Sequence, residues 1–409
     1  VHSLLSPRES GETPVSDSGD AHVVSARLLR SARRSITTVY FIAGALYASW
    51  APRIPEVKAH LHLSNVSLGF ALFAPAIGAV VAMPAVGALV TRHSSKTVLA
   101  GAILAFSAPP VLIGLCGSLP PLFVVLLAWG VGIGALEVSM NTQAVTVQAA
   151  HARPVMAGLH AWYSIGALVG AGLGALAASM ALPVEVHLAV AGGCALGAGL
   201  ASTPRLIRAP SETDHDRRFP KLERRLVALG AMSFACLLCE GAAADWSAVY
   251  LRDSLFASAG IAGLAYAVFS AAMAAGRLGG DRLTVALGER HLVMLSGAIA
   301  AVGFGVGLAI GTVASTIVGF GALGLGLACV LPLVFSAAGR VGVPAPSIAA
   351  VTTSGYLGFL AGPPTIGAIS GLAGLQPTLG IVVALAAAIT AISRGDVLKS
   401  AGTRARRSS

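Results

Sequence analysis

Several ionisable side chains lie within long stretches of the chain that are otherwise almost entirely apolar. Glu137, His160, Glu240 and Asp245 lie inside such stretches, and Arg53 lies at the end of one. Stretches of about 20 apolar residues match the length of a helix that crosses a bilayer. A charge at the bilayer centre costs about 2.5–3.5 kcal/mol on insertion scales, so these groups need a compensating role. We therefore treat them as candidate solute- or proton-binding residues.

Glu137 and Asn141 are four residues apart, so both side chains project from one face of a helix. This spacing favours a polar site within the membrane. The alternative is a structural hydrogen-bonded pair that joins two helices. Burial raises the affinity of a carboxylate for a proton, so Glu137 or Glu240 is suited to load and release protons.

Glu240 and Asp245 lie in the same apolar stretch, with Trp246 beside the aspartate. They are expected either to contact the solute or to form an ion pair with Arg53 or His160. His160 is itself either a proton carrier or a polar residue that is satisfied near a helix end.

Three aromatic residues accompany the charged groups and are further binding candidates. Trp50 precedes Arg53, and Trp162 and Tyr163 follow His160. Their rings are suited to stack against a sugar ring. For Trp50 the alternative is anchoring at the membrane–water interface, where tryptophan is enriched.

The sequence carries none of the common motifs of a catalytic or nucleotide-binding site. It has no Gly-x-x-x-x-Gly-Lys-Ser/Thr loop, no His-Glu-x-x-His and no Gly-x-Ser-x-Gly. Cys236 and Cys239 have metal-ligand spacing but lie within an apolar stretch, which favours packing over a metal site. We expect no enzyme activity, no catalytic residue, no metal and no cofactor.

The elements that carry these residues are expected to be membrane-spanning helices. The chain is 56% hydrophobic and only 11% charged, whereas soluble domains are about 25% charged. Twelve runs qualify as spans: 36–57, 65–90, 97–116, 120–148, 154–179, 184–202, 226–250, 258–280, 290–310, 312–339, 345–371 and 374–393. Runs of this length exclude the short strands of a membrane barrel.

Basic residues concentrate in alternate gaps between these runs and in both tails. The remaining gaps hold only Arg53, Lys58 and Arg252. By the positive-inside rule, both termini are cytoplasmic in a multi-pass protein of the cell membrane, specifically the inner membrane. The net charge of +10 thus reflects topology and attraction to anionic lipid, and it does not require a nucleic-acid partner.

The longest polar interruption divides the runs into two groups of six that resemble each other. Gly166 and Gly170 of the first group have counterparts in Gly358 and Gly362 of the second, 192 residues later. Trp50 has a counterpart in Trp246 at nearly the same offset, 196 residues later. We predict an all-α membrane fold of two pseudo-symmetric six-helix bundles. Its expected parts are a disordered cytoplasmic tail (1–34), an N-terminal bundle (35–202), a cytoplasmic linker (203–225), a C-terminal bundle (226–393) and a cytoplasmic tail (394–409).

The loop after the second run resembles the signature of the major facilitator superfamily, Gly-x-Leu-x-Asp-Arg-x-Gly-Arg-Arg. Gly87, Leu89, Arg92 and Lys96 match this signature, and Thr91 replaces its aspartate. The resemblance implies transport by alternating access and a cytoplasmic gate. We expect the gate to comprise Arg92, Lys96, Arg277, Asp281 and Arg282.

Further segments resemble the MosC-like subgroup of that superfamily. They are Trp50-Ala-Pro-Arg-Ile-Pro55, Glu137-Val-Ser-Met-Asn141, the stretch 240–250, Gly276-Arg-Leu-Gly-Gly-Asp-Arg282 and the stretch 355–364. The resemblance implies a small polar solute, sugar- or cyclitol-like. We expect a monomeric secondary transporter that is coupled to protons. The alternatives are a drug or metabolite efflux antiporter of the same fold and a transporter-like membrane receptor.

Overall fold

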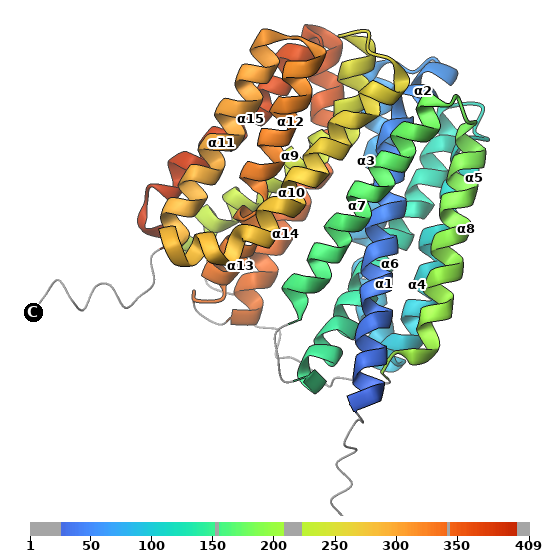
Figure 1. The fold of residues 1–409 in the computed structure, drawn as a ribbon, viewed down its shortest axis with the longest axis vertical. Coiled ribbons are helices and arrows are strands. Elements are labelled where there is room, and N and C mark those ends of the chain that lie inside the picture. Colours follow the sequence, from blue (N-terminus) through green and yellow to red (C-terminus); the bar gives the residue numbers. More distant parts are fainter. Residues whose placement is uncertain (1–25, 152–154, 208–222, 342–343, 399–409) are drawn as a thin grey trace, which may run out of the picture.

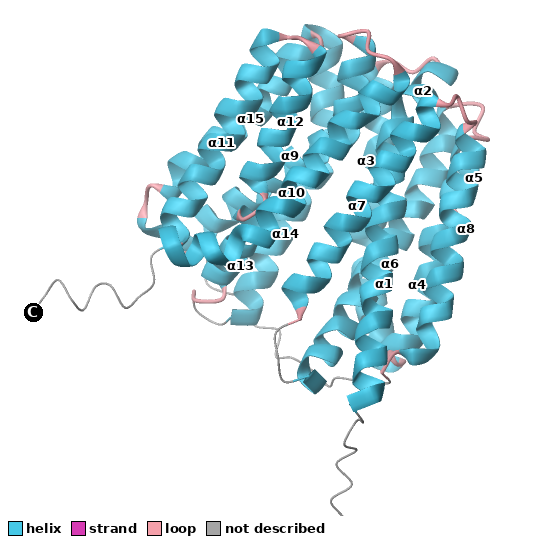
Figure 2. Cartoon of the chain, viewed as in Figure 1, coloured by secondary structure: helices cyan, strands magenta, loops and turns pink. Residues whose placement is uncertain are grey.

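The molecule is a bundle of helices, and within its described residues ten helices are long and apolar enough to cross a membrane. The computed structural model describes residues 26–151, 155–207, 223–341 and 344–398, and these ranges contain no strand (Figures 1 and 2). The remaining parts of the predicted tails and linker lie outside the described residues. The predicted all-α membrane fold is confirmed. The count of twelve spans stays a prediction, because α1 and α14 are not among the ten helices.

The first half of the chain forms one group of helices. It comprises α1 (Ala26–Trp50), α2 (Ile54–His60), α3 (Asn65–Arg92), α4 (Ser95–Ser107), α5 (Pro110–Ile113), α6 (Leu119–His151), α7 (Met156–Ser179) and α8 (Val184–Ser202). The second half comprises α9 (Arg224–Asp253), α10 (Ala259–Leu287), α11 (Glu289–Ile310), α12 (Val313–Leu327), α13 (Val330–Ala338), α14 (Pro344–Ala373) and α15 (Leu375–Ser393). Figure 1 shows the two groups side by side.

Proline explains where the structure departs from the predicted spans. The run 36–57 is not one helix: α1 ends at Trp50, and Pro52 and Pro55 open the short 3-10 turn Ala51–Arg53 and α2. Proline lacks the N–H that would continue a helical ladder. Likewise, Pro332 cannot donate to the carbonyl of Ala328, and α12 and α13 are separated at that point.

The predicted disordered tail of residues 1–34 is wrong for its last part, because α1 already begins at Ala26. The segment contains Arg27, Arg30, Arg33 and Arg34 but no glycine or proline. Arginine, alanine and leucine are good helix formers, so nothing in the segment interrupts the helix that the following apolar residues form.

The internal resemblance between the halves corresponds to equivalent helix contacts. A Cβ atom at Gly166 of α7 would lie 2.0 Å from the carbonyl oxygen of Phe41 on α1. At the corresponding position, a Cβ at Gly358 of α14 would lie 2.2 Å from the carbonyl oxygen of Phe234 on α9. Small residues let helix backbones approach closely, and here they do so at the same interface in both halves.

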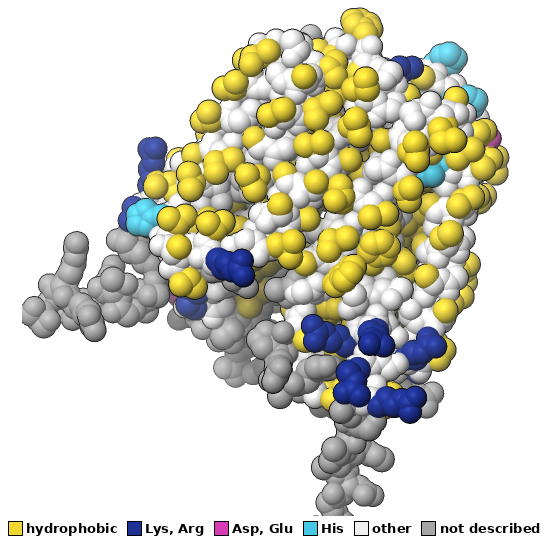
Figure 3. All heavy atoms as spheres, in the orientation of Figure 1, with side chains coloured by type: hydrophobic (Ala, Val, Ile, Leu, Met, Phe, Trp, Pro, Cys, Tyr) yellow, Lys and Arg dark blue, Asp and Glu magenta, His cyan; other side chains and the backbone are white. Residues whose placement is uncertain are grey.

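The bundle has two distinct ends. The beginning of α1 and the end of α15 lie at one end, which we call the termini end, and α2 lies at the opposite end, the α2 end (Figure 1). In Figure 3, Lys and Arg side chains gather near the termini end, and hydrophobic side chains cover the surface between the ends. This distribution is the one expected of a protein whose middle contacts lipid.

The halves contact each other through α7 with α10 and through α3 with α14. The backbones of the two halves come close at the α2 end, where a Cβ at Gly69 would lie 2.5 Å from the carbonyl oxygen of Pro363. Lys58 of α2 also forms an ion pair there with Asp253 at the end of α9. The α2 end is therefore an interface between the halves.

Candidate functional site

Glu137 lies near the middle of α6, and the side-chain hydrogen bonds of its neighbour Asn141 do not involve the Glu137 carboxylate. The Tyr40 hydroxyl of α1 donates to Oδ1 of Asn141 at 2.6 Å, and Nδ2 of Asn141 donates to the backbone oxygen of Glu137 at 2.8 Å. Asn141 is thus held by its own helix and by α1. The amide does not satisfy the Glu137 carboxylate, which remains available to a group from another element.

That group comes from the other half of the molecule. The Tyr356 hydroxyl of α14 is a hydrogen-bond partner of the Glu137 carboxylate. Glu137 is only partly buried. A carboxylate that is shared between the halves in this way gives up a bond when the halves separate.

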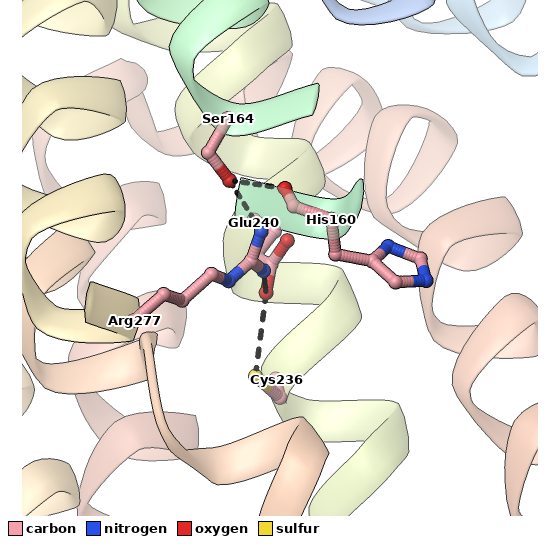
Figure 4. Close-up of polar contacts among 5 residues, drawn as sticks. All are labelled: His160, Ser164, Cys236, Glu240 and Arg277. Carbon is pink, nitrogen blue, oxygen red and sulfur yellow. Dashed lines mark hydrogen bonds and ion pairs between the residues drawn. The ribbon is translucent and has the colours of Figure 1, made fainter. Parts of the chain in front are cut away.

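A second contact between the halves centres on Arg277 of α10 (Figure 4). Its Nη1 atom donates to Ser164 Oγ of α7 at 2.8 Å, and its Nη2 atom lies 3.8 Å from Oε1 of Glu240 on α9. The Cys236 thiol, one turn before Glu240, faces the same carboxylate at 3.7 Å. Each charged side chain keeps 21% of its surface accessible, so the pair is reachable from open space.

His160 lies on α7, one turn before Ser164, and its ring packs edge-to-face on Tyr40 with centroids 5.2 Å apart. Figure 4 shows the imidazole pointing away from Arg277 and Glu240. The residue is exposed although helices surround it, so open space borders this part of the site. Tyr163, the third predicted residue of α7, lies within electrostatic range of Glu137, Glu240 and Arg277.

Asp245 lies further along α9 toward the α2 end, and it is buried. It is within electrostatic range of Tyr47 and Tyr266, one from each half. The ion pairs suggested for Glu240 and Asp245 with Arg53 or His160 are not the ones found. Glu240 pairs with Arg277 instead, because α10 lies between α9 and α7 at this level.

Three predicted site residues lie elsewhere. Trp50 is buried in the N-terminal half against Trp129, with centroids 6.5 Å apart, so its ring is part of the core. Arg53 is fully buried at the α2 end, where it pairs with Glu56 at 2.6 Å and donates to the carbonyl of Leu182. Trp162 is 46% exposed on the outer side of α7, next to Phe41.

The predicted gate residues do not form one group. Arg277 belongs to the site above rather than to a loop, because α10 continues to Leu287 and carries it within the bundle. Lys96 donates to the Pro204 carbonyl within its own half at 2.6 Å, and Arg92 and Arg282 are exposed. The side chain of Asp281 lies outside the described part of the chain. A gating role for these four residues stays a prediction.

Tyr40, Tyr356 and Ser164 were not among the site residues predicted from the sequence. A signal existed for the tyrosines, because a hydroxyl in an apolar stretch needs a polar partner when it is buried. The chain has only 6 tyrosines, and all of them lie in the helices described here. Ser164 offered no such signal, since serine is frequent in membrane helices and often bonds only its own backbone.

This arrangement, with two pseudo-symmetric halves and a polar site between them, is that of a secondary transporter. The Major Facilitator Superfamily profile matches residues 36–342. The chain therefore belongs to the major facilitator superfamily of membrane transporters. It is 36% identical over 374 residues to an uncharacterized MFS-type transporter of Yersinia pestis, covering 88% of this chain and 94% of that protein. It is 30% identical over 362 residues to the membrane protein MosC of Rhizobium meliloti, covering 87% of each.

Solved structures with this fold are more distant in sequence. A point mutant of the nucleoside transporter NupG superposes with a TM-score of 0.72 at 15% identity, covering 88% of this chain and 99% of that protein. A bacterial homologue of the lysosomal transporter Spinster, in an inward-facing and occupied conformation, also gives a TM-score of 0.72, at 13% identity. It covers 90% of this chain and 97% of that protein. These similarities establish the fold.

Proposed function

We propose that the protein carries a small polar solute across the cell membrane by alternating access, in exchange with or together with protons. The observation that carries this proposal is that both halves contribute to one polar site through two separate links. Glu137 of one half meets Tyr356 of the other, and Arg277 joins Ser164 to Glu240. A site whose bonds cross between the halves changes composition when the halves rock.

The carboxylates of Glu137 and Glu240 are the proposed proton carriers. Glu240 has a cationic partner, whereas Glu137 has a neutral tyrosine, so the two carboxylates respond to different events. Movement of α10 against α9 changes the charge environment of Glu240. Separation of α14 from α6 removes a hydrogen bond from Glu137, and hydrogen bonding to the charged form is what lowers proton affinity.

The proposed solute is polyhydroxylated, of the size of a sugar or a cyclitol. Tyrosine hydroxyls, an amide, an imidazole and a guanidinium supply both donors and acceptors around the site. Aromatic rings from α1 and α7 provide apolar faces on which a ring compound can stack. Such a mixture suits a neutral solute that is rich in hydroxyl groups.

The contacts at the α2 end support a conformation that is closed at that end. Because basic residues mark the termini end as cytoplasmic by the positive-inside rule, the proposed state faces inward. Both termini are then cytoplasmic, and the protein acts as a monomer.

The test is solute flux in proteoliposomes with an imposed pH gradient. A panel of radiolabelled sugars, cyclitols and amino sugars identifies the solute, and uptake that collapses with an uncoupler and in Glu137→Gln supports proton coupling. Flux that is unchanged by the pH gradient and by Glu137→Gln would overturn proton coupling. Protein-dependent solute flux outward against a proton gradient would assign the efflux antiporter instead, and binding without flux would assign a receptor.

A further inference from the structure

A hollow of about 630 Å³ lies on the flank of the bundle at the termini end, between α1 and α7. It is lined by Arg30, Arg33, Arg34, Thr37, Thr38, Phe41 and Trp162. None of these residues takes part in the site between the halves. The hollow therefore calls for a separate explanation.

The part of the hollow nearest the beginning of α1 is strongly basic. Arg30, Arg33 and Arg34 are all exposed, and no described carboxylate forms an ion pair with them. The described residues that line the hollow include no acidic residue. Three guanidinium groups within five residues of α1, with no anionic partner among the described residues, suit a ligand that carries negative charge.

The deeper part of the hollow is apolar and aromatic. Phe41 and Trp162 pack edge-to-face with ring centroids 6.3 Å apart, and Trp162 remains 46% exposed. At 100° per residue, the side chain of Trp162 lies on the side of α7 opposite to His160. His160 packs on Tyr40 toward the site, so Trp162 and the hollow face the outside of the bundle.

The length of α1 places these two parts at different depths of the bilayer. The helix has 25 residues, which is about 37 Å, whereas the hydrocarbon core is about 30 Å thick. The first turns of α1, which carry the arginines, therefore reach the headgroup region. Phe41 lies seven residues beyond Arg34, about 10 Å deeper, at the level of the acyl chains.

From this arrangement we infer that the hollow binds an anionic phospholipid, with its phosphate on Arg30, Arg33 and Arg34 and its acyl chain against Phe41 and Trp162. Basic pockets between membrane helices are suited to anionic headgroups, and each arginine near an anionic surface strengthens attraction. A free phosphate would use the three arginines alone. The exposed rings below them favour a ligand with a hydrocarbon chain.

The chain offers a direct probe of this site. Of its 4 tryptophans, only Trp162 is exposed, whereas Trp50, Trp129 and Trp246 are at most 4% exposed. Quenching of tryptophan fluorescence by brominated lipid therefore reports on Trp162, and Trp162→Phe gives the background. The full chain in mixed micelles is titrated with brominated phosphatidylglycerol and, in parallel, with brominated phosphatidylcholine.

The variant Arg30→Gln/Arg33→Gln/Arg34→Gln tests the basic part. Its matched control is Arg27→Gln/Arg205→Gln/Arg224→Gln, which removes the same charge from exposed arginines that do not line the hollow. We expect wild type and control to prefer phosphatidylglycerol. The pocket variant should lose this preference, by about five-fold for each arginine and on the order of 100-fold in all.

Equal quenching by the two lipids in the wild type, or a preference that survives in the pocket variant, would overturn the inference. Inorganic phosphate that raises the melting temperature of the wild type but not of the pocket variant, in a protein that shows no preference between the two lipids, would assign the arginines to a soluble phosphate and reject the lipid. The readout is binding, so it is independent of the transported solute.

Discussion

Among single residues, Arg277 makes the most consequential contact in the molecule. It is the cation next to Glu240, and it reaches across from α10 to Ser164 of the other half. A guanidinium is suited to this position because it donates to two acceptors at once while it keeps its charge. The position of α10 relative to α7 and the charge state near Glu240 are therefore linked through one side chain.

Removing this cation should cost stability as well as transport. Arg277→Gln leaves the partly buried Glu240 carboxylate without its cationic partner, and a partly accessible carboxylate pays only part of the cost of about 1–3 kcal/mol that a buried unsatisfied group carries. The melting temperature in detergent should fall for Arg277→Gln and recover in the double variant Arg277→Gln/Glu240→Gln, which has no unpaired charge. Transport should stay low in both. A double variant that is less stable than Arg277→Gln would show that the ion pair does not explain the loss.

The Tyr356 hydroxyl should matter for transport. Tyr356→Phe removes a hydrogen bond to a charged group, worth about 1.5–3 kcal/mol, so transport should fall by roughly 10- to 100-fold. The matched control is Tyr250→Phe, since the Tyr250 hydroxyl is fully buried and has no hydrogen-bond partner in the described structure. Equal transport rates in the two variants would remove Tyr356 from the site.

The sequence predicted the ionisable part of the site better than its partners. Glu137, His160 and Glu240 could be recognised because charge in an apolar stretch is costly. Their partners could not, because Tyr356 and Ser164 are distant in sequence and no spacing within one chain encodes a contact between helices. The burial of Trp50 could not be predicted for a related reason: the packing of α1 on α6, which places its ring against Trp129, follows only from the fold.

Among the helices, the sequence predicted positions well and ends poorly. Hydrophobic length located the long spans, because a bilayer requires about 20 apolar residues whatever the fold. Helix ends depended on single residues such as Pro52 and Pro332, and the arginines in the first turns of α1 looked like a polar tail although they are helical. Polarity is a weak guide to helix ends where a helix extends beyond the hydrocarbon core.

Close contact between α1 and α7 should be sensitive to a single methyl group. A Cβ at Gly170 would lie 1.9 Å from the carbonyl oxygen of Ala45, whereas a Cβ at Gly172 of the same helix meets nothing within 4 Å. Gly170→Ala should therefore destabilise the protein by about 1–3 kcal/mol through overpacking, seen as a lower melting temperature. Gly172→Ala should be neutral or slightly stabilising, because alanine is the better helix former. A lower melting temperature for Gly172→Ala would contradict the packing argument.

For the molecule as a whole, the contacts between the halves determine which end is closed. The two halves contact each other at the α2 end, through Gly69 against Pro363 and through the ion pair of Lys58 with Asp253. Backbone approach at a glycine limits how far the helices can slide, while an ion pair can break and re-form. Lys58 and Asp253 are therefore the adjustable part of this closure.

Breaking the ion pair should shift the population of conformations without unfolding the protein. An exposed ion pair is worth about 0.2–1 kcal/mol, so Lys58→Ala should raise the fraction open at the α2 end by up to roughly five-fold. Spin labels are placed at Met180 and Leu372, exposed residues of opposite halves, in a Cys194→Ser background. The distance between the two labels, measured by electron spin resonance, reports opening at the α2 end. The charge swap Lys58→Asp/Asp253→Lys should restore the wild-type distance distribution. If Lys58→Ala leaves that distribution unchanged, closure at the α2 end depends on the glycine contacts and not on the ion pair.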